Sequence, residues 1–409
     1  MTTVVRGGTL IDGTGDDPRP ADVTLADGLI RSVDAASTPS SRDEVIDVDG
    51  LTLLPGLIDA HTHFGLVDLT GTGSTPVAMI AAQIFRNCEL ALDAGFTTSR
   101  DCGGVDGGLA RAIDAGLIRG PRLYPSGPIL CQTGGHGDMT PPFAPHSHGV
   151  SVPGLVQQAL VCDGPEEVRI AARTVFRHGA TQVKVCVSGG VVSLTDRLED
   201  TQFSVDELRA AVEEAEARET YVTAHAHNVR GIRNGLEAGV RCFEHGTFLD
   251  EATATALAEA GAWLVPTLAV TRVLTEEWET WGLPKEVVPR MSGVEEAMTQ
   301  SVKLAYDAGV LIGSGSDLIG PAQNRRGLEL TLKARILGPM AAIVSATSTN
   351  ARIVGASDRL GSVEVGKVAD LIAIDGDPLT DPDVFDDPAR VVLVVKDGRV
   401  VKDSRGAAG

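Results

Sequence analysis

Short apolar segments alternate with longer amphipathic segments over residues 57–350, and this order limits the fold more than any other feature of the chain. Such alternation predicts parallel strands joined by crossover helices. Eight strands in this order favour a (β/α)8 barrel. A doubly wound open sheet is the alternative, but no glycine-rich phosphate loop follows the first strand. The expected strands are Leu57–His63, Thr97–Asp101, Arg122–Ser126, Gln182–Val187, Tyr221–His227, Arg241–His245, Trp263–Pro266 and Leu311–Ser314.

The two ends of the chain have a different texture. Short apolar runs separated by Gly- and Asp-rich turns fill both the first and the last 50 residues, a pattern typical of antiparallel strands. Asp397-Gly398, between two apolar runs, predicts a hairpin. We therefore expect residues 1–56 and 351–409 to build one composite β-sandwich domain beside a catalytic barrel of residues 57–350.

Charge and composition exclude several classes of function. The net charge of −20 argues against a nucleic-acid or anionic-membrane partner, because both need clustered positive charge. The sequence contains no run of 18 apolar residues, and MTTVVRGGTLIDGTG has no signal-peptide pattern. The six cysteines are dispersed without a CxxC pair, as expected of small buried residues rather than disulfides. These features predict a cytoplasmic protein.

Histidines occur in pairs more often than chance allows. The chain has nine, for which random placement predicts about 0.2 His-x-His pairs, yet three are present. His61 and His63 end an apolar run, and positions i and i+2 of a strand face the same side. His225 and His227 repeat this arrangement, and His245 ends another expected strand. Side chains at the C-terminal ends of barrel strands form barrel active sites, so these five histidines predict a metal centre.

Two further residues at strand ends admit alternative interpretations. Lys184 lies within the apolar run QVKVCV, where it either extends toward the strand end or is carbamylated by CO2 into a carboxylate that bridges two metals. Asp317 follows LIGSGS and is either a helix N-cap or a proton shuttle beside the metals. A third histidine pair, His146 and His148, lies in a long Gly/Pro-rich loop and is expected to be lid or surface structure.

The sequence resembles the amidohydrolase superfamily over nearly its whole length. PGLIDAHTH at 55–63, SGG at 188–190, HAH at 225–227, EHGT at 244–247 and LGSVEVGKVADLIAID at 360–375 are similar to its landmarks. The nearest branch contains Xaa-Pro and Xaa-Arg dipeptidases, imidazolonepropionase-like proteins and ochratoxinase. Members of this branch combine a barrel with a small β-sandwich formed by both termini, and they are often large homo-oligomers, so the resemblance implies a homo-oligomer here.

The resemblance also implies roles for individual residues. Two divalent ions, expected to be zinc, would be bridged by carbamylated Lys184. His227 would face the substrate and polarise the scissile carbonyl. His136 in TGGHGD would contact the terminal carboxylate of the substrate. The first ion would be bound by His61, His63 and Asp317, and the second by His225 and His245.

These expectations describe a binuclear hydrolase that cleaves the amide bond of a dipeptide or N-acyl amino acid through a metal-bridging hydroxide. Asp317 would act as base and then as acid. Arg325, together with Arg326, is a candidate contact for an anionic substrate. A deaminase or cyclic amidase, a lactonase, and a carbamate or organophosphate hydrolase would use the same activated water. An inactive metal-binding scaffold is the alternative outside the enzymes.

Overall fold

The computed structural model describes residues 2–67, 75–140, 143, 151–192, 195–279, 288–320 and 323–405. The histidine pair His146 and His148 lies outside these ranges. All six cysteines are buried and free of disulfides, as the sequence predicted. Of the helices that the structure describes, none is long and apolar enough to cross a membrane.

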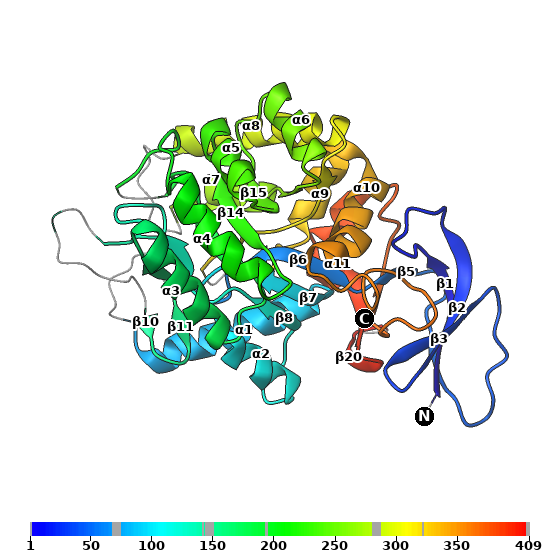
Figure 1. Cartoon of the computed structure of the whole chain (residues 1–409). Helices are drawn as coiled ribbons and strands as arrows, with labels where there is room; N and C mark the ends of the chain where they lie inside the picture. Colours follow the sequence, from blue (N-terminus) through cyan, green and yellow to red (C-terminus); the bar gives the residue numbers. More distant parts are fainter. Residues whose placement is uncertain are drawn as a thin grey trace.

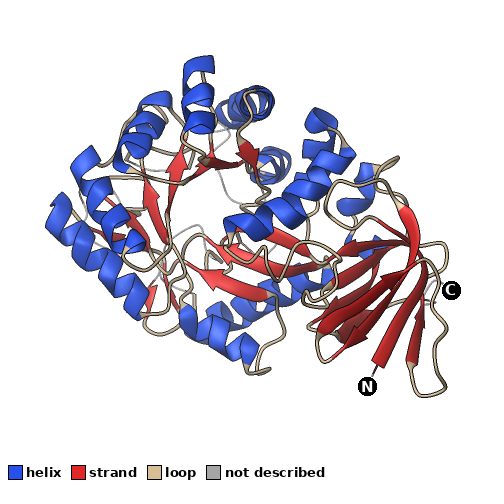
Figure 2. Cartoon of the chain, turned by 45° about the vertical axis from the view of Figure 1, so that its right-hand side comes forward, coloured by secondary structure: helices blue, strands red, loops and turns tan. Residues whose placement is uncertain are grey.

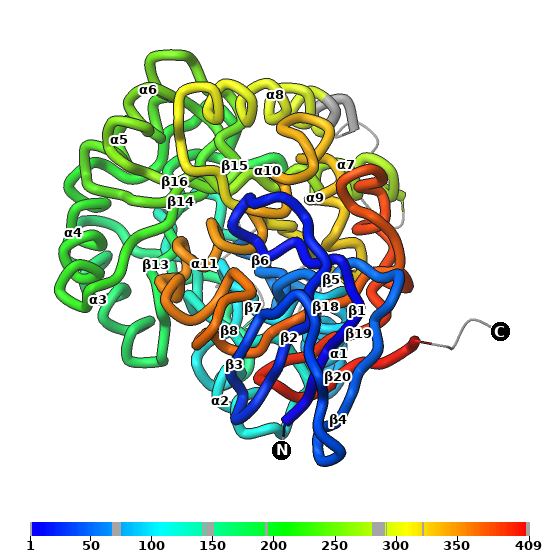
Figure 3. Tube along the Cα trace, turned by 90° about the vertical axis from the view of Figure 1, so that its right-hand side faces the viewer, coloured from blue at the N-terminus to red at the C-terminus, as the bar shows by residue number. Residues whose placement is uncertain are grey.

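Strands from both ends of the chain pair in one eight-stranded sheet (Figures 1 and 3). Its order is β20-β19-β18-β5-β1-β2-β3, with β4 paired to β1. The join between the two ends is the antiparallel pairing of β18 with β5, and β19 and β20 form the hairpin expected at Asp397-Gly398. The strands are β1 (Thr2–Leu10), β2 (Arg19–Ala26), β3 (Leu29–Asp34), β4 (Glu44–Asp47), β5 (Thr52–Pro55), β18 (Leu371–Ile374), β19 (Val391–Lys396) and β20 (Arg399–Asp403).

Each of the eight strands expected between the termini is present. Together with two further strands, β9 and β12, they form parallel ladders, one of β6-β7-β8 and one of β9-β13-β14-β15-β16-β17 with β12 at its edge. The members are β6 (Leu57–Thr62), β7 (Phe96–Asp101), β8 (Arg122–Pro125), β9 (Ile129–Cys131), β12 (Ala159–Val161), β13 (Val183–Cys186), β14 (Val222–Ala226), β15 (Cys242–His245), β16 (Trp263–Val265) and β17 (Leu311–Ile312).

Hydrogen bonds join the two ladders at both edges. The amide of Ala60 in β6 donates to the Ser314 carbonyl after β17 at 2.9 Å, and the amide of Thr181 donates to the Pro125 carbonyl at 2.8 Å. Asn350 reinforces the first junction, because its side-chain amide donates to the carbonyls of Ile58 (2.6 Å) and Ser314 (2.8 Å). The parallel strands therefore run without an open edge between β6 and β17.

The third strand position differs from the expectation. The sequence predicted one strand over 122–126, but the structure divides this position between β8, which pairs with β7, and β9, which pairs with β13. Gly127, with a φ of 71°, lies in the break between them. The interruption redirects the chain after β8, so that β9 continues toward the cavity described below.

Helices cover the outside of the parallel strands (Figure 2). Local signals set their ends: α4 starts with a capping box between Ser204 and Glu207, and Asn228 caps α5 by accepting from the amide of Gly231. The helices are α1 (Val77–Asp93), α2 (Gly107–Asp114), α3 (Gly164–Arg177), α4 (Val205–Glu216), α5 (Val229–Ala238), α6 (Glu251–Glu259), α7 (Leu268–Glu277), α8 (Val288–Asp307), α9 (Leu328–Leu337), α10 (Pro339–Val344) and α11 (Asn350–Ile353).

The terminal sheet packs directly against the helix-covered part. One buried apolar cluster contains residues of both, so no solvent layer separates them. From the terminal sheet it includes Leu54, Ile372 and Ile374, and from α1, β7, α9 and α10 it includes Leu92, Phe96, Leu330 and Ile343.

Candidate active site

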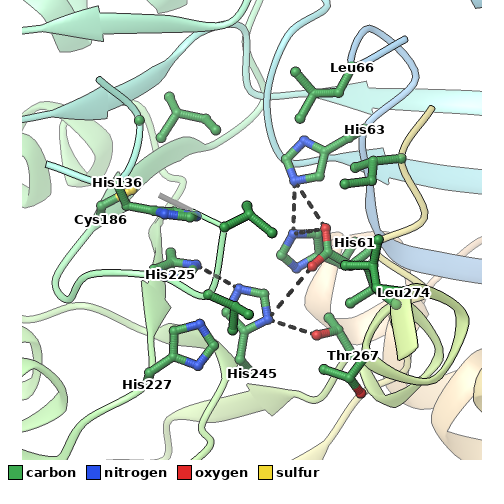
Figure 4. Close-up of a pocket in the computed structure, with 18 of the residues that line it drawn as sticks. His61, His63, Leu66, His136, Cys186, His225, His227, His245, Thr267 and Leu274 are labelled. Carbon is green, nitrogen blue, oxygen red and sulfur yellow. Dashed lines mark hydrogen bonds and ion pairs between the residues drawn. The ribbon is translucent and has the colours of Figure 1, made fainter. Parts of the chain in front are cut away.

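Side chains from the C-terminal ends of the parallel strands meet at one cavity, where α/β folds of this kind carry their active sites. The six side chains predicted to hold metal ions and the two histidines predicted to contact substrate all line it. Figure 4 shows the histidine rings facing a common space. The eight residues are His61, His63, His136, Lys184, His225, His227, His245 and Asp317.

His61 and His63 direct one ring nitrogen each at the other. His61 donates its Nδ1–H to Glu244 Oε2 at 2.7 Å, and His63 donates its Nδ1–H to the Gly103 carbonyl at 2.9 Å. Both partners only accept hydrogen bonds, so the tautomer that a metal ion requires, with Nε2 free, fits both rings. These Nε2 atoms lie 3.2 Å apart, and Asp317 Oδ1 lies 3.5 Å from that of His61 and 3.3 Å from that of His63. A cation among them would satisfy all three acceptors.

His225 and His245 form a second pair. His225 Nε2 donates to the Gly189 carbonyl at 3.2 Å, which leaves its Nδ1 free, 2.8 Å from His245 Nε2. A metal ion there requires His245 to donate its Nδ1–H to Thr267 Oγ1, and their separation of 2.7 Å fits that tautomer. Burial, followed by the neighbouring rings, holds the pKa of His225 and of His245 well below the usual histidine value. Both rings are therefore in the neutral form that binds metals.

Lys184 is the least satisfied group of the cavity. Its side chain is buried, and its Nζ has no hydrogen-bond partner among the described residues. A lone buried ammonium is costly, because the interior does not replace its hydration. Its charge contributes to lowering the pKa of both His63 and His225, so it acts on the two histidine pairs at once.

Asp317 follows β17 and combines burial with an unusual backbone. Its φ is 53°, in the left-handed region that non-glycine residues rarely adopt, and its amide donates to the His61 carbonyl at 2.8 Å. Burial raises the pKa of its carboxyl, and the opposing effects of His61 and Lys184 are smaller. A raised pKa makes this carboxylate a better proton acceptor than an ordinary aspartate.

The model of the amidohydrolase family matches residues 52–401, most of the chain and all of this site. This chain belongs to the amidohydrolase family. It is therefore a metal-dependent hydrolase that acts on amide bonds, as the sequence indicated.

Several known amidohydrolases are similar over nearly the full length. Ochratoxinase of Aspergillus niger is 35% identical, over 98% of this chain and 86% of its own. The crystal structure of a prolidase complexed with N-methylphosphonate-L-proline is 38% identical with a TM-score of 0.92, covering 98% of this chain and 100% of that one. A Xaa-Pro dipeptidase crystallised with methionine in its active site is 31% identical with a TM-score of 0.87, covering 98% and 100%.

Glu244 is a functional side chain of this amidohydrolase that the sequence reasoning missed. It lies directly before His245, and alternation in a regular strand points neighbouring residues to opposite faces. His245 has a φ of 68°, which departs from strand geometry and lets both side chains face inward. Burial raises the pKa of Glu244, but the charges of Arg100 and His61 outweigh burial and the net pKa is well below the ordinary value. The carboxylate that holds His61 is therefore ionised.

Arg100 in β7 forms an ion pair with Glu244 at 2.5 Å, and both side chains are fully buried. The adjacent Asp101 accepts from the backbone amides of Phe64 (2.8 Å) and Gly103 (3.1 Å). Arg100 thus holds Glu244 in place, and Asp101 holds the backbone that follows β6 and β7.

The Ser188–Gly190 turn positions the remaining histidines. The Ser188 hydroxyl accepts from the amide of His227 at 2.8 Å, and the His227 ring meets the Thr247 hydroxyl at 2.6 Å. The ring of His136 stacks on His225 with centroids 4.1 Å apart. A Cβ on Gly190 would lie 2.1 Å from the His136 ring, so only glycine leaves room for it there.

The structure places the two arginines proposed for substrate outside the cavity lining. Arg325 forms ion pairs with Glu276 at 2.8 Å and with Asp386 at 2.7 Å. Arg326 is fully buried and pairs with Asp59 at 2.8 Å. Both charges are therefore already neutralised by carboxylates of the protein.

Apolar side chains line the same cavity as the histidines. Val270 and Leu274 stand one turn apart on α7, and Met291 and Met298 come from α8. Ile319 contributes from the loop after Asp317. The cavity of this amidohydrolase therefore has both a polar histidine cluster and an apolar wall.

Proposed function

We propose that this protein cleaves the amide bond of a dipeptide or N-acyl amino acid at two divalent metal ions, held at the mouth of a closed (β/α)8 barrel. The observation that carries the proposal is the convergence of two pairs of ring nitrogens in one cavity that also holds a buried lysine without a hydrogen-bond partner among the described residues. His225, His227 and His245 form one group of possible metal ligands and His61, His245 and Asp317 another, which supports two cations, and zinc prefers nitrogen and oxygen ligands of this kind.

The first ion is assigned to His61, His63 and Asp317, and the second to His225 and His245. The Lys184 amine, after losing a proton to solvent, would add to CO2 and release a second proton to give a carbamate. This carboxylate would serve as a further metal ligand, and the charge of the ions would balance its own inside the protein. When bound, the ions supply Lewis acidity and lower the pKa of a water molecule toward about 7.

The side chains then control the protons and the orientation of the substrate. Asp317 accepts the proton of the attacking water and passes it to the nitrogen of the leaving amine, a role that its raised pKa supports. His227, held by Ser188 and Thr247, hydrogen-bonds the scissile carbonyl and supports the charge that develops on its oxygen. His136 contacts the far end of the substrate.

The substrate carries an apolar side chain in this proposal. The apolar wall of α7 and α8 supports this choice, because it removes such a group from water. The similarity to a prolidase and to a Xaa-Pro dipeptidase supports a dipeptide-like molecule, and the similarity to ochratoxinase supports an amide with a bulky acyl group.

The terminal sheet is assigned to a composite domain of residues 1–56 and 351–409, and the barrel to residues 57–350. Pairing of β5 with β18 supports a single terminal domain, since each end supplies strands that the other needs. Hydrogen bonds between β6 and the segment after β17, from Ala60 to Ser314 and from Asp317 to His61, support closure of the barrel.

A substrate screen tests the proposal. Protein loaded with Zn2+ in bicarbonate buffer is assayed against dipeptides and N-acyl amino acids, with lactones and ring amines as controls. We expect amide hydrolysis, and a loss of kcat of about 100- to 10,000-fold in Asp317→Asn, typical of removing an acid–base group. Metal content of the variant is measured in parallel, since Asp317 is also an assigned ligand. Full turnover by the variant, or release of ammonia from ring amines only, would contradict the proposal.

A further inference from the structure

We call His61, His63 and Asp317 the first half of the proposed metal centre. A buried carboxylate, that of Glu244, lies behind the ring of His61 in this half. Glu244 accepts from His61 Nδ1 at 2.7 Å through one oxygen and from Arg100 at 2.5 Å through the other. Such a partner fixes the tautomer of the imidazole and makes the nitrogen that faces the ion more basic. Asp317 adds a second carboxylate, which faces the ion directly.

The half formed by His225 and His245, called the second half, has neutral hydrogen-bond partners behind its rings, and the carboxylate of Asp317 reaches it only at 3.9 Å, from Oδ2 to His245 Nδ1. The Gly189 carbonyl accepts from His225 at 3.2 Å, and the Thr267 hydroxyl lies 2.7 Å from His245. Neither hydrogen bond carries the charge that Glu244 supplies in the first half. The second half thus has two neutral ligands of its own, against two histidines and a carboxylate in the first.

We propose that the two halves hold their ions with unequal affinity: the first half fills first and empties last, and Glu244 is the positioning residue that sets much of the difference. The inference rests on the binuclear site proposed above. Glu244 contacts the first half, and Asp317 lies closer to the rings of His61 and His63 (3.5 and 3.3 Å) than to His245 (3.9 Å), in a buried site where charges are weakly screened. Loss of a hydrogen-bond partner behind a metal-binding histidine typically costs about 10- to 100-fold in metal affinity.

The order of filling can be measured on the unmodified protein. After removal of metal by a chelator, Co2+ is added stepwise in bicarbonate buffer, while the visible absorption and the bound cobalt are followed. We expect two binding steps at least 10-fold apart. Crystals of the protein with one equivalent of Co2+ should show anomalous scattering in the first half only.

Matched variants assign the difference to Glu244. Glu244→Gln keeps the shape of the side chain and removes its charge, and we expect it to weaken the tighter step by about 10- to 100-fold. Thr267→Val removes the partner of His245 and should weaken only the second step. Thr223→Val removes a hydroxyl that donates to Glu244 while leaving both buried charges in place, so it should weaken the tighter step to a smaller extent.

The outcomes separate this inference from the function on which it rests. Two Co2+ ions that bind with equal affinity, or a first ion located at His225 and His245, would overturn the inference and leave the binuclear hydrolase intact. Saturation at a single ion would overturn the binuclear proposal itself. If Glu244→Gln does not fold because Arg100 loses its partner, the titration of the unmodified protein and of Thr223→Val still decides.

Discussion

The tautomer of a histidine at this site follows from the atom that contacts the ring nitrogen pointing away from the cavity. A hydrogen-bond acceptor at that position, such as the Gly103 carbonyl beside Nδ1 of His63, keeps a proton on Nδ1 and leaves Nε2 of the neutral ring free. Burial, which lowers the pKa of His63, adds to this because it disfavours the charged ring. The protein therefore presents neutral ligands to a cation instead of repelling it.

Lys184 provides a test of the bridging carboxylate. We expect Lys184→Ala to hold fewer than two metal ions and to lose at least about 100-fold of its activity, because a ligand shared by both ions is gone. Added propionate should restore part of both, since it fits the space vacated by the side chain. Metal content and kcat are measured with and without propionate.

Lys184→Met is the matched control, because it fills the same space without an amine. It should lose metal as Lys184→Ala does but show no recovery with propionate. Two tightly bound ions in Lys184→Ala without any added carboxylate would show that no carbamate is needed.

Asp101 predicts a specific pH dependence of stability. Burial raises its pKa to about 7, against opposing hydrogen bonds from the amides of Phe64 and Gly103. Because its folded-state pKa lies above the unfolded value, its contribution to stability is complete below the unfolded pKa and is lost as the pH rises toward 7. Between pH 5 and pH 8 the wild type should lose about 3 kcal/mol relative to Asp101→Asn, at 1.36 kcal/mol per pH unit over about two units.

Urea unfolding of both proteins at pH 5, 6, 7 and 8, at constant metal content, checks this value. The substitution also changes the free energy of unfolding by an amount that does not depend on pH. The test is therefore how the difference between the two proteins changes from pH 5 to pH 8. A difference between the two proteins that stays constant over this range would show that Asp101 is already ionised at pH 5.

Sequence reasoning predicted the residues whose signal is local and missed those that depend on distant partners. His61, His63, His225 and His245 were predicted because spacing and strand ends are visible in the sequence. Glu244 was missed because it directly precedes His245, and ordinary strand alternation places neighbouring side chains on opposite faces; the left-handed φ of His245 brings both inward. Arg325 was proposed to contact substrate because the sequence does not reveal its ion-pair partners. These are Glu276 and Asp386, which lie 49 and 61 residues away in the chain.

At the scale of elements, α7 is the helix that we expect to set specificity. Leu274→Ala shortens its apolar wall, and kcat/KM for a substrate with a large apolar side chain should fall about 10-fold, which corresponds to about 1.4 kcal/mol of lost burial. The same substrate with an alanine side chain should be affected less than 3-fold. Equal losses for both substrates would show that Leu274 supports the fold rather than the bound group.

The order of strands and helices was predictable because hydrophobic periodicity and turn residues are local signals. The division of the third strand into β8 and β9 was not, since it follows from pairing partners: β8 with β7, and β9 with β13. The apolar wall was also not predicted, because α7 and α8 meet only in three dimensions.

At the scale of the whole molecule, the terminal sheet shares its core with helices that cover the parallel strands. A fragment of residues 57–350 would expose Leu92, Phe96, Leu330 and Ile343, which are all buried in the full chain. At about 1.5 to 3 kcal/mol for each large apolar side chain, the loss approaches the total stability of an ordinary domain. We expect this fragment to show no cooperative urea transition by tryptophan fluorescence, whereas the full chain does. A cooperative transition in the fragment would show that the barrel folds alone.

The net charge of −20 has little part in the chemistry, because Lys184 and Asp317 are the only Lys, Arg, Asp or Glu residues among the described lining of the cavity. The surface carries most of the acidic residues, where they keep the molecule soluble. A substrate thus meets a local environment set by a few buried groups rather than by the overall charge.

The peptide between Glu244 and His245 links the two halves of the centre mechanically. One side chain supports His61 and the other faces His225, although the two residues are neighbours in the chain. A rotation of that single peptide unit would move the Glu244 carboxylate and the His245 ring together. The two proposed ion sites therefore share one peptide unit, and a backbone shift in β15 that disturbs one of them is expected to reach the other.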